Sequence, residues 1–250
     1  ALAGHLRLHK LVVLFDDNGI SIDGPLSLAD SVDQVKRFEA AGWSACRIDG
    51  HDPEAIAAAI ANAKASDRPT LIACKTVIGY GAPTKAGKAS AHGSPLGADE
   101  IKGARERLGW NEAPFQVPAD VLTQWRAAGQ RSKAARKDWD RRLSGLPAGR
   151  RAEFERRMRG DLPGALNGAV RTLKEKFAAE PQDLATRIAC ERALELIIPA
   201  VPEMVGGSAD LTGSNNTRIK AMQAMSAQDY SGRFIHYGVR EHGMAAAMNG

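Results

Sequence analysis

The 250-residue sequence lacks any apolar run near the ~18 residues that a membrane-spanning helix requires. Its N-terminus also lacks the charged, apolar and cleavage regions of a secretory signal peptide. Aromatic residues make up only 5% of the chain, but apolar residues reach 44%, which is enough for one large α/β domain or parts of two. We therefore expect a globular, cytoplasmic protein that does not contact membranes.

Cysteine is also scarce, with three residues at Cys46, Cys74 and Cys190. Their wide spacing matches neither a disulfide framework nor a zinc site. Each lies in an apolar run, which predicts buried free thiols in a reducing compartment. The cytoplasm is the expected location on this ground too.

Positive charge exceeds negative charge by +5, and the excess is concentrated in one stretch. Residues 131–159 hold eleven Lys or Arg against four Asp or Glu, a balance that a nucleic-acid-binding module would also show. Apolar side chains recur there at helical spacing, at Trp139, Leu143, Phe154 and Met158, with acids interleaved. Solvated amphipathic helices are therefore favoured, and no nucleic-acid partner is expected.

Strand and helix patterns alternate in the first part of the chain. The expected elements, in order strand, helix, strand, helix, strand, cover residues 10–15, 31–42, 43–48, 51–66 and 69–76. Asp52 is the expected N-cap of the second helix, with Pro53 at its first helical position. This order predicts a parallel sheet with right-handed crossovers, in which ligands bind beyond the carboxyl ends of the strands.

The rest of the sequence predicts a bridge and a second α/β domain. The expected divisions are residues 1–110 for the first domain, 111–165 for a basic helical linker and 166–250 for the second domain. The chain has no initiating Met, and it opens and closes inside helical patterns. We therefore expect a segment of a longer protein in which both domains are incomplete.

Two loops of the first domain carry polar residues at predicted strand ends. In residues 16–24, Asp16, Asp17 and Asn18 surround an Asn-Gly turn. Their oxygens suit a hard cation such as Mg²⁺ or Ca²⁺ that also holds phosphate, although a plain turn uses the same residues.

The second of these loops, residues 77–97, is longer than a connector requires. It carries His92 among glycines, with Lys85 and Lys88 nearby, which suits contact with a phosphorylated ligand. An exposed histidine without a role is the alternative.

The second domain offers two further polar features. Arg187 and the loop GSADLTGSNNT supply a guanidinium and small hydroxyl groups, which suit phosphate, although Arg187 is equally compatible with a plain helix surface. The stretch FIHYGVREHGM predicts a strand followed by a helix whose first turn holds Glu241. Glu241 is either a first-turn acid that favours the helix dipole or a carboxyl group for proton transfer.

Four motifs in this order closely resemble transketolase, the thiamine-diphosphate enzyme family that moves two-carbon ketol units between sugar phosphates. They are LVVLFDDNGISIDG, CKTVIGYGAPTKAGKASAHGSPLG, GGSADLTGSNNT and IHYGVREHGMAAAMNG. The resemblance implies a parallel-sheet thiamine-diphosphate-binding fold, with the later part of the diphosphate-binding domain, a linker and the start of the pyrimidine-binding domain. It also implies sugar-phosphate substrates and a homodimer with the active site at the subunit interface.

The resemblance assigns cofactor-binding roles to four positions. Asn18 and the backbone carbonyl of Ile20 match the ligands of the Mg²⁺ or Ca²⁺ ion, and Asn18 lies near the diphosphate. His92 matches a histidine that contacts both cofactor and sugar. Asp210 matches an aspartate near the cofactor at the subunit boundary.

Substrate binding and catalysis are implied at further positions. Arg187 and Ser214 match residues that hold the sugar phosphate. Glu241 matches the catalytic glutamate, which hydrogen-bonds a pyrimidine nitrogen of the cofactor so that the cofactor's amino group can take a proton. Such a carboxyl group must exchange a proton near neutral pH, whereas a free Glu titrates at about 4.3, and small apolar neighbours in GMAAAM are expected to enclose it.

Some family features differ or are absent in this sequence. The Gly-Asp-Gly metal motif and two substrate histidines nearer the N-terminus are absent, and Gly213 stands where many relatives have Pro. The segment alone is therefore not expected to be active. A dihydroxyacetone synthase, which uses formaldehyde as acceptor, and a non-catalytic relative are the alternatives to a transketolase of the pentose phosphate pathway or Calvin cycle.

Overall fold

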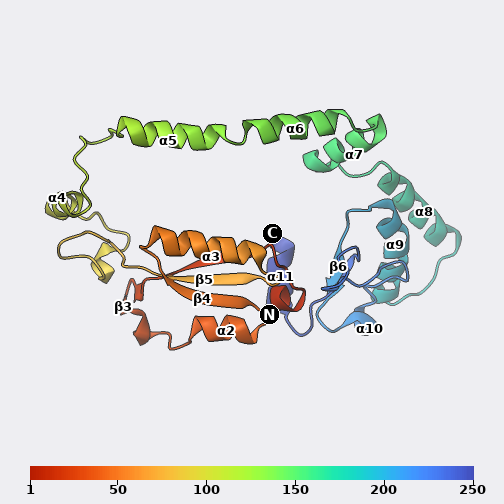
Figure 1. The fold of residues 1–250 in the computed structure, drawn as a ribbon. Coiled ribbons are helices and arrows are strands. Elements are labelled where there is room, and N and C mark those ends of the chain that lie inside the picture. Colours follow the sequence, from red (N-terminus) through yellow and green to blue (C-terminus); the bar gives the residue numbers. More distant parts are fainter. The chain divides into compact units, whose positions relative to one another are not determined.

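The computed structural model describes residues 1–250, which form two compact units, residues 1–119 and 120–250 (Figure 1). The predicted linker is divided between them. None of the helices combines the length and apolarity needed to span a bilayer.

A three-stranded parallel sheet forms the centre of the first unit. Its strands are β1 (Val12–Asp17), β4 (Ser44–Asp49) and β5 (Thr70–Lys75), in the spatial order β1-β5-β4. The first five residues of β5 are buried, as expected for a continuous apolar run in the middle of a parallel sheet. All three predicted strands are confirmed.

Two helices cover this sheet on opposite faces, α2 (Gln34–Ala40) and α3 (Pro53–Ala65) (Figure 1). Opposite faces follow from right-handed crossovers, because the chain moves outward across the sheet from β1 to β4 and back from β4 to β5. The Asp52 side chain accepts hydrogen bonds from the amides of residues 54 and 55, at 3.0 and 3.2 Å. The predicted N-cap is therefore confirmed.

Short elements complete the first unit. They are α1 (Leu2–His5), the antiparallel pair β2 (Ile20–Ser21) and β3 (Gly24–Pro25), 3₁₀ turns at Leu26–Leu28 and Ala89–Ala91, and α4 (Ala98–Arg107). Residues 76–97 link β5 to α4 with only one short turn of helix.

Four helices follow. They are α5 (Ala119–Gln130), α6 (Lys133–Ser144), α7 (Ala148–Arg159) and α8 (Ala165–Ala179). Acids within α6 pair with its arginines, at 3.0 Å for Arg136–Asp140 and 3.0 Å for Arg141–Asp138. Trp139 meets Phe154 of α7 edge to face, with ring centroids 6.1 Å apart. These contacts match the predicted amphipathic helices.

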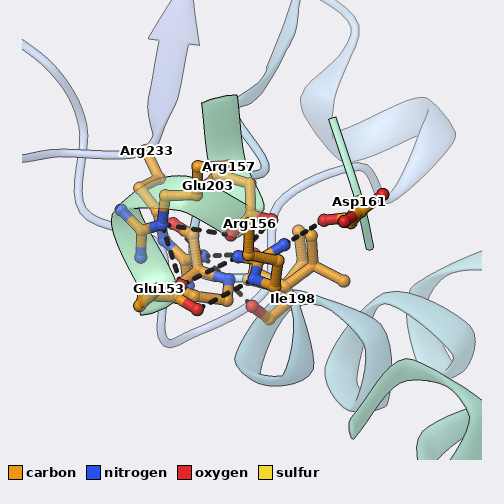
Figure 2. Close-up of polar contacts among 9 residues, drawn as sticks. Glu153, Arg156, Arg157, Asp161, Ile198, Glu203 and Arg233 are labelled. Atoms are coloured by element: carbon orange, nitrogen blue, oxygen red, sulfur yellow. Dashed lines mark hydrogen bonds and ion pairs between the residues drawn. The ribbon is translucent and has the colours of Figure 1, made fainter. Parts of the chain in front are cut away.

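The helix after α8 is α9 (Thr186–Ala200), and a charged cluster connects α7 to the loop that follows α9 (Figure 2). Arg156 contacts Glu153 at 2.8 Å and Glu203 at 2.9 Å, and Arg157 contacts Glu153 at 2.8 Å. Arg233 donates to three backbone carbonyls at the end of α9 and just beyond it. Within the second unit, ion pairs therefore fix the last part of the basic stretch to the segment after α9.

The second unit contains a smaller parallel sheet. Its further elements are β6 (Gly206–Ser208), α10 (Thr212–Asn215), β7 (Phe234–His236) and α11 (Glu241–Asn249). The core beside this sheet consists of Ile198, Ile219, Met222 and Phe234. The strand and helix predicted around FIHYGVREHGM are confirmed.

The cysteines differ in exposure. Cys74 is buried in β5 and Cys46 is partly buried in β4, and burial raises the pKa of both thiols. Cys190 is exposed, so the prediction that it is buried was wrong. Its segment is a helix, and in a helix an apolar stretch still turns some positions to solvent.

The charged cluster predicts a pH-dependent stability. Hydrogen bonds from Arg156 and Arg157 lower the pKa of Glu153 from 4.5 to about 2. A carboxyl group whose pKa is depressed by folding stabilises the fold above its unfolded pKa, and this stabilisation is lost as the pH falls through the folded pKa. Glu153→Gln should therefore lower the unfolding temperature at pH 7, and the difference from the wild type should vanish between about pH 4.5 and pH 2.

Glu155→Gln is the matched control, because Glu155 lies on the same helix and meets Arg151 at 3.7 Å. Thermal unfolding of both variants between pH 2 and pH 7 checks the expectation. An equal effect of the two substitutions at pH 7 would show that the cluster contributes nothing beyond an ordinary surface pair.

Candidate functional site

In the first unit, the loops that follow β1 and β5 leave the sheet at the same level. The parallel register pairs Asp17 with Lys75, the last residues of the two strands. Thr76 donates a side-chain hydrogen bond to Asp16, and the side-chain amide of Asn18 lies 3.5 Å from the same carboxylate. The carboxyl edge therefore gathers an acid, an amide and a hydroxyl group.

Neighbouring acids at this edge have different surroundings, because successive side chains of a strand point to opposite faces. Asp17 lies 3.9 Å from Lys75 and 3.8 Å from Arg47, so cations neutralise it. Asp16 lines a cavity instead. Of the two acids expected near a cation, Asp16 is the one placed beside Asn18.

Asn18 is fixed by a tight turn. Its Oδ1 accepts a hydrogen bond of 2.9 Å from the amide of Ile20, and Gly19 adopts a left-handed φ of 71° that favours glycine. Pro25 lies opposite Ile20 in the small antiparallel pair and has no N–H to donate to it. The turn therefore presents amide and backbone oxygens at the edge of the sheet.

His92 and Asn18 line the same cavity, which has a volume of about 590 Å³. Asp16, Thr76 and Gly79 contribute to its wall. Thr76 was not singled out from the sequence, although its position at the carboxyl end of the expected strand 69–76 was available as a signal. The structure thus brings together two of the predicted site residues that are 74 positions apart in the chain.

The oxygen donors at this edge fit a hard cation in kind. Amide and carbonyl oxygens are ligands that Mg²⁺ and Ca²⁺ accept, and Asn18 Oδ1 keeps one lone pair after its bond to Ile20. No group of three or more His, Cys, Asp or Glu gathers anywhere in the chain. A cation bound here would therefore need ligands beyond those that this chain supplies.

In the second unit, the remaining predicted residues follow the parallel strands β6 and β7. The register pairs Ser208 with His236, so the loops with Asp210 and Glu241 leave at the same edge. Asp210 has a left-handed φ of 66°, a strained conformation for a residue other than glycine. Strained positions of this kind cluster at binding sites.

Hydrogen bonds fix the loop that holds Ser214. Ser208 Oγ accepts from the amide of Leu211 at 3.1 Å and lies 3.5 Å from the side-chain amide of Asn215. The side chain of Asn216 donates to Glu191 of α9 at 2.8 Å. Arg187 lies one turn before Glu191 on that helix, and both Arg187 and Ser214 are exposed.

Glu241 is the first residue of α11, and Arg240 before it donates to the carbonyl of Tyr237 at 2.7 Å. Glu241 is exposed, and of the residues in GMAAAM only Met244 is partly buried. Within this chain GMAAAM does not enclose Glu241, because α11 turns most of its surface to solvent, and the enclosure stays a prediction.

Two family models match the sequence. The model described as transketolase, thiamine diphosphate binding domain, matches residues 1–163, and the model described as transketolase, pyrimidine binding domain, matches residues 182–250. The transketolases of Cereibacter sphaeroides and Rhodobacter capsulatus are 51% and 47% identical over 249 residues. Each comparison covers 100% of this chain and 37% of the relative.

Solved structures agree with these matches. Pichia stipitis transketolase in complex with sedoheptulose 7-phosphate superposes with a TM-score of 0.88 and 38% identity, covering 99% of this chain and 38% of that one. Leishmania mexicana transketolase gives a TM-score of 0.85 and 34% identity, covering 99% and 37%. The parallel-sheet thiamine-diphosphate-binding fold is confirmed, and the chain spans little more than a third of the relatives' length.

The strain at Asp210 predicts a difference between two substitutions that remove the same carboxylate. Asp210→Gly relieves the left-handed backbone, whereas Asp210→Ala retains a Cβ in it. The Gly variant should be more stable than the Ala variant by about 1 kcal/mol, measured by urea unfolding. Equal stabilities would mean that residue 210 leaves the left-handed region without cost.

Proposed function

This chain belongs to the transketolase family, and on that basis we propose that it is part of a transketolase that moves a two-carbon ketol unit from a ketose phosphate to an aldose phosphate. The observation that carries the proposal is the convergence of Asn18 and His92 on one cavity at the carboxyl edge of a parallel sheet. That edge is where such sheets bind phosphorylated cofactors.

In this proposal, the first unit holds the diphosphate end of the cofactor. Asn18 Oδ1 and the Ile20 carbonyl bind Mg²⁺ or Ca²⁺, which neutralises the diphosphate. His92, on the wall of the same cavity, hydrogen-bonds the cofactor and a sugar hydroxyl group. Thiamine diphosphate, when bound, supplies the carbon nucleophile that the protein's own side chains lack.

The second unit handles the pyrimidine end and the substrate phosphate. Glu241 holds a proton at a pyrimidine nitrogen, and Asp210 lies beside the cofactor. Arg187 and Ser214 bind the phosphate of the sugar through charge-assisted hydrogen bonds. These residues are exposed, which suits groups that meet a ligand.

We further propose a cytoplasmic homodimer in which the second unit of one subunit meets the first unit of its partner. Glu241 requires a desolvated surrounding to exchange a proton near neutral pH, and its own helix does not supply one. A subunit interface would supply it. The enzyme would act in the pentose phosphate pathway or the Calvin cycle, which use the same chemistry.

Glu241→Gln tests the catalytic assignment. The substitution keeps size and hydrogen bonding but cannot exchange a proton, so turnover in the full-length enzyme should fall by ~100-fold or more. Cofactor affinity should persist, because the charged diphosphate and the metal anchor the cofactor far from this carboxyl group. The measurement is hydrogen–deuterium exchange at the thiazolium carbon with the cofactor saturating. Exchange at the wild-type rate would reduce Glu241 to a first-turn helix acid.

Arg187→Ala tests the phosphate assignment. The Michaelis constant for ribose 5-phosphate should rise by about tenfold or more, with a much smaller change for a non-phosphorylated acceptor. Arg192→Ala is the matched control, since Arg192 lies on the same helix and its guanidinium binds Gln182 at 2.6 Å. Equal losses with both acceptors would argue that Arg187 acts on stability rather than on phosphate.

A further inference from the structure

One face of α4 lies against the loop that carries His92. The loop leaves β5, passes through residues 76–97 and continues directly into α4. The side chains of Glu100 and Arg107 and the bare backbone of Gly103 lie on one side of the helix, because their spacing is three and four residues. All three positions contact residues 82–85 of the loop.

Of these three positions, Glu100 accepts the most hydrogen bonds from the loop. Its carboxylate accepts backbone hydrogen bonds from Thr84 at 3.1 Å and Lys85 at 3.3 Å, and it also accepts the Thr84 hydroxyl. The hydroxyl and amide of Thr84 are the main reason that the pKa of Glu100 lies below its ordinary value. One carboxylate therefore satisfies three donors of two successive loop residues, and hydrogen bonds to a charged acceptor are the stronger kind.

The rest of the same face fixes the helix close to the loop. A Cβ at Gly103 would overlap the ring of Pro83, so only glycine allows this approach. Arg107 donates to the carbonyl of Ala82 at 3.1 Å. The contact therefore extends along the whole stretch from Ala82 to Lys85.

Lys85 extends this support to the other end of the loop. Its Nζ donates to the carbonyl of Leu96 at 2.7 Å and lies 3.5 Å from that of Pro95. Residues 85–96 are thereby closed into a ring that contains His92. The sequence predicted Lys85 as a cation for a phosphorylated ligand, but in the structure its ammonium binds the loop itself.

We propose that Glu100 and Lys85 are positioning residues for His92, which hold the loop at both ends so that the imidazole stays on the wall of the cavity beside Asn18. The inference rests on the proposed function, since it assumes that His92 meets the cofactor and the sugar. Its physical basis is pre-organisation: a loop that is ordered before the ligand arrives does not lose that freedom on binding. Neither residue lines the cavity, so neither needs to touch the ligand.

The test uses Glu100→Gln in the full-length enzyme. A glutamine places an NH₂ group against the loop amides, so amide hydrogen exchange at residues 84, 85 and 92 should accelerate by about tenfold or more. Asp99→Asn is the matched control, because it removes the same charge from the same turn of α4. Unchanged exchange in Glu100→Gln would overturn the proposal.

Kinetics separate positioning from a general loss of stability. The Michaelis constant for the sugar phosphate should rise severalfold in Glu100→Gln, while the cofactor dissociation constant stays within about twofold, because Asn18 and the metal are untouched. The double variant with His92→Ala should be no worse than His92→Ala alone. Losses that multiply in the double variant would show that Glu100 acts independently of His92 and would overturn the proposal.

Lys85→Met gives a second route to the same answer, with Lys102→Met on α4 as its control. Lys85→Met should also accelerate amide exchange at residue 92. Combined with His92→Ala, it should add nothing to the kinetic loss that His92→Ala causes alone. If the wild-type enzyme transferred no ketol unit, the proposed function would fail, but exchange would still show whether Glu100 and Lys85 order the loop. Normal transfer with unchanged exchange in both variants would overturn the inference alone.

Discussion

Parallel pairing of short strands is the constraint on which both groups of site residues depend. Because β1 and β5 end in register, Asn18 and Thr76 leave the sheet side by side, although 58 positions separate them. Shifting β1 by one residue would turn Asp16 away from the cavity and Asp17 into it, since alternate side chains face opposite ways. The chemistry of the edge is therefore set by the burial of β5, which fixes the register.

In the second unit, parallel pairing also places the site residues, but the paired strands are shorter. β6 and β7 are three residues each, yet they bring the Asp210 and Glu241 loops to one edge. Such short strands gain little from their own pairing, so the buried side chains of Ile198, Met222 and Phe234 supply most of the support. That apolar cluster offsets the unfavourable backbone at Asp210.

Local patterns were sufficient to predict the elements but not the contacts between distant residues. The apolar runs of β1 and β5 and the Asp52 cap were readable because each depends on neighbours in the sequence. Motif resemblance supplied Asn18 and His92, and the structure then placed them on one cavity.

Other contacts could not be predicted from the local sequence. Nothing near Glu100 indicates that its carboxylate binds Thr84, sixteen residues away, because a first-turn acid is expected in any helix. The exposure of Cys190 and Glu241 was equally unpredictable, since apolar composition does not say which side of a helix packs against another element.

The sheet of the first unit has two outer strands, β1 and β4, each with one row of backbone N–H and C=O groups that no strand of this chain pairs. Leu14 of β1 is also 52% exposed. Such edges act as templates for pairing with another copy of the same strand. Handled as an isolated polypeptide, this segment therefore presents two strand edges at which a further strand can add to the sheet.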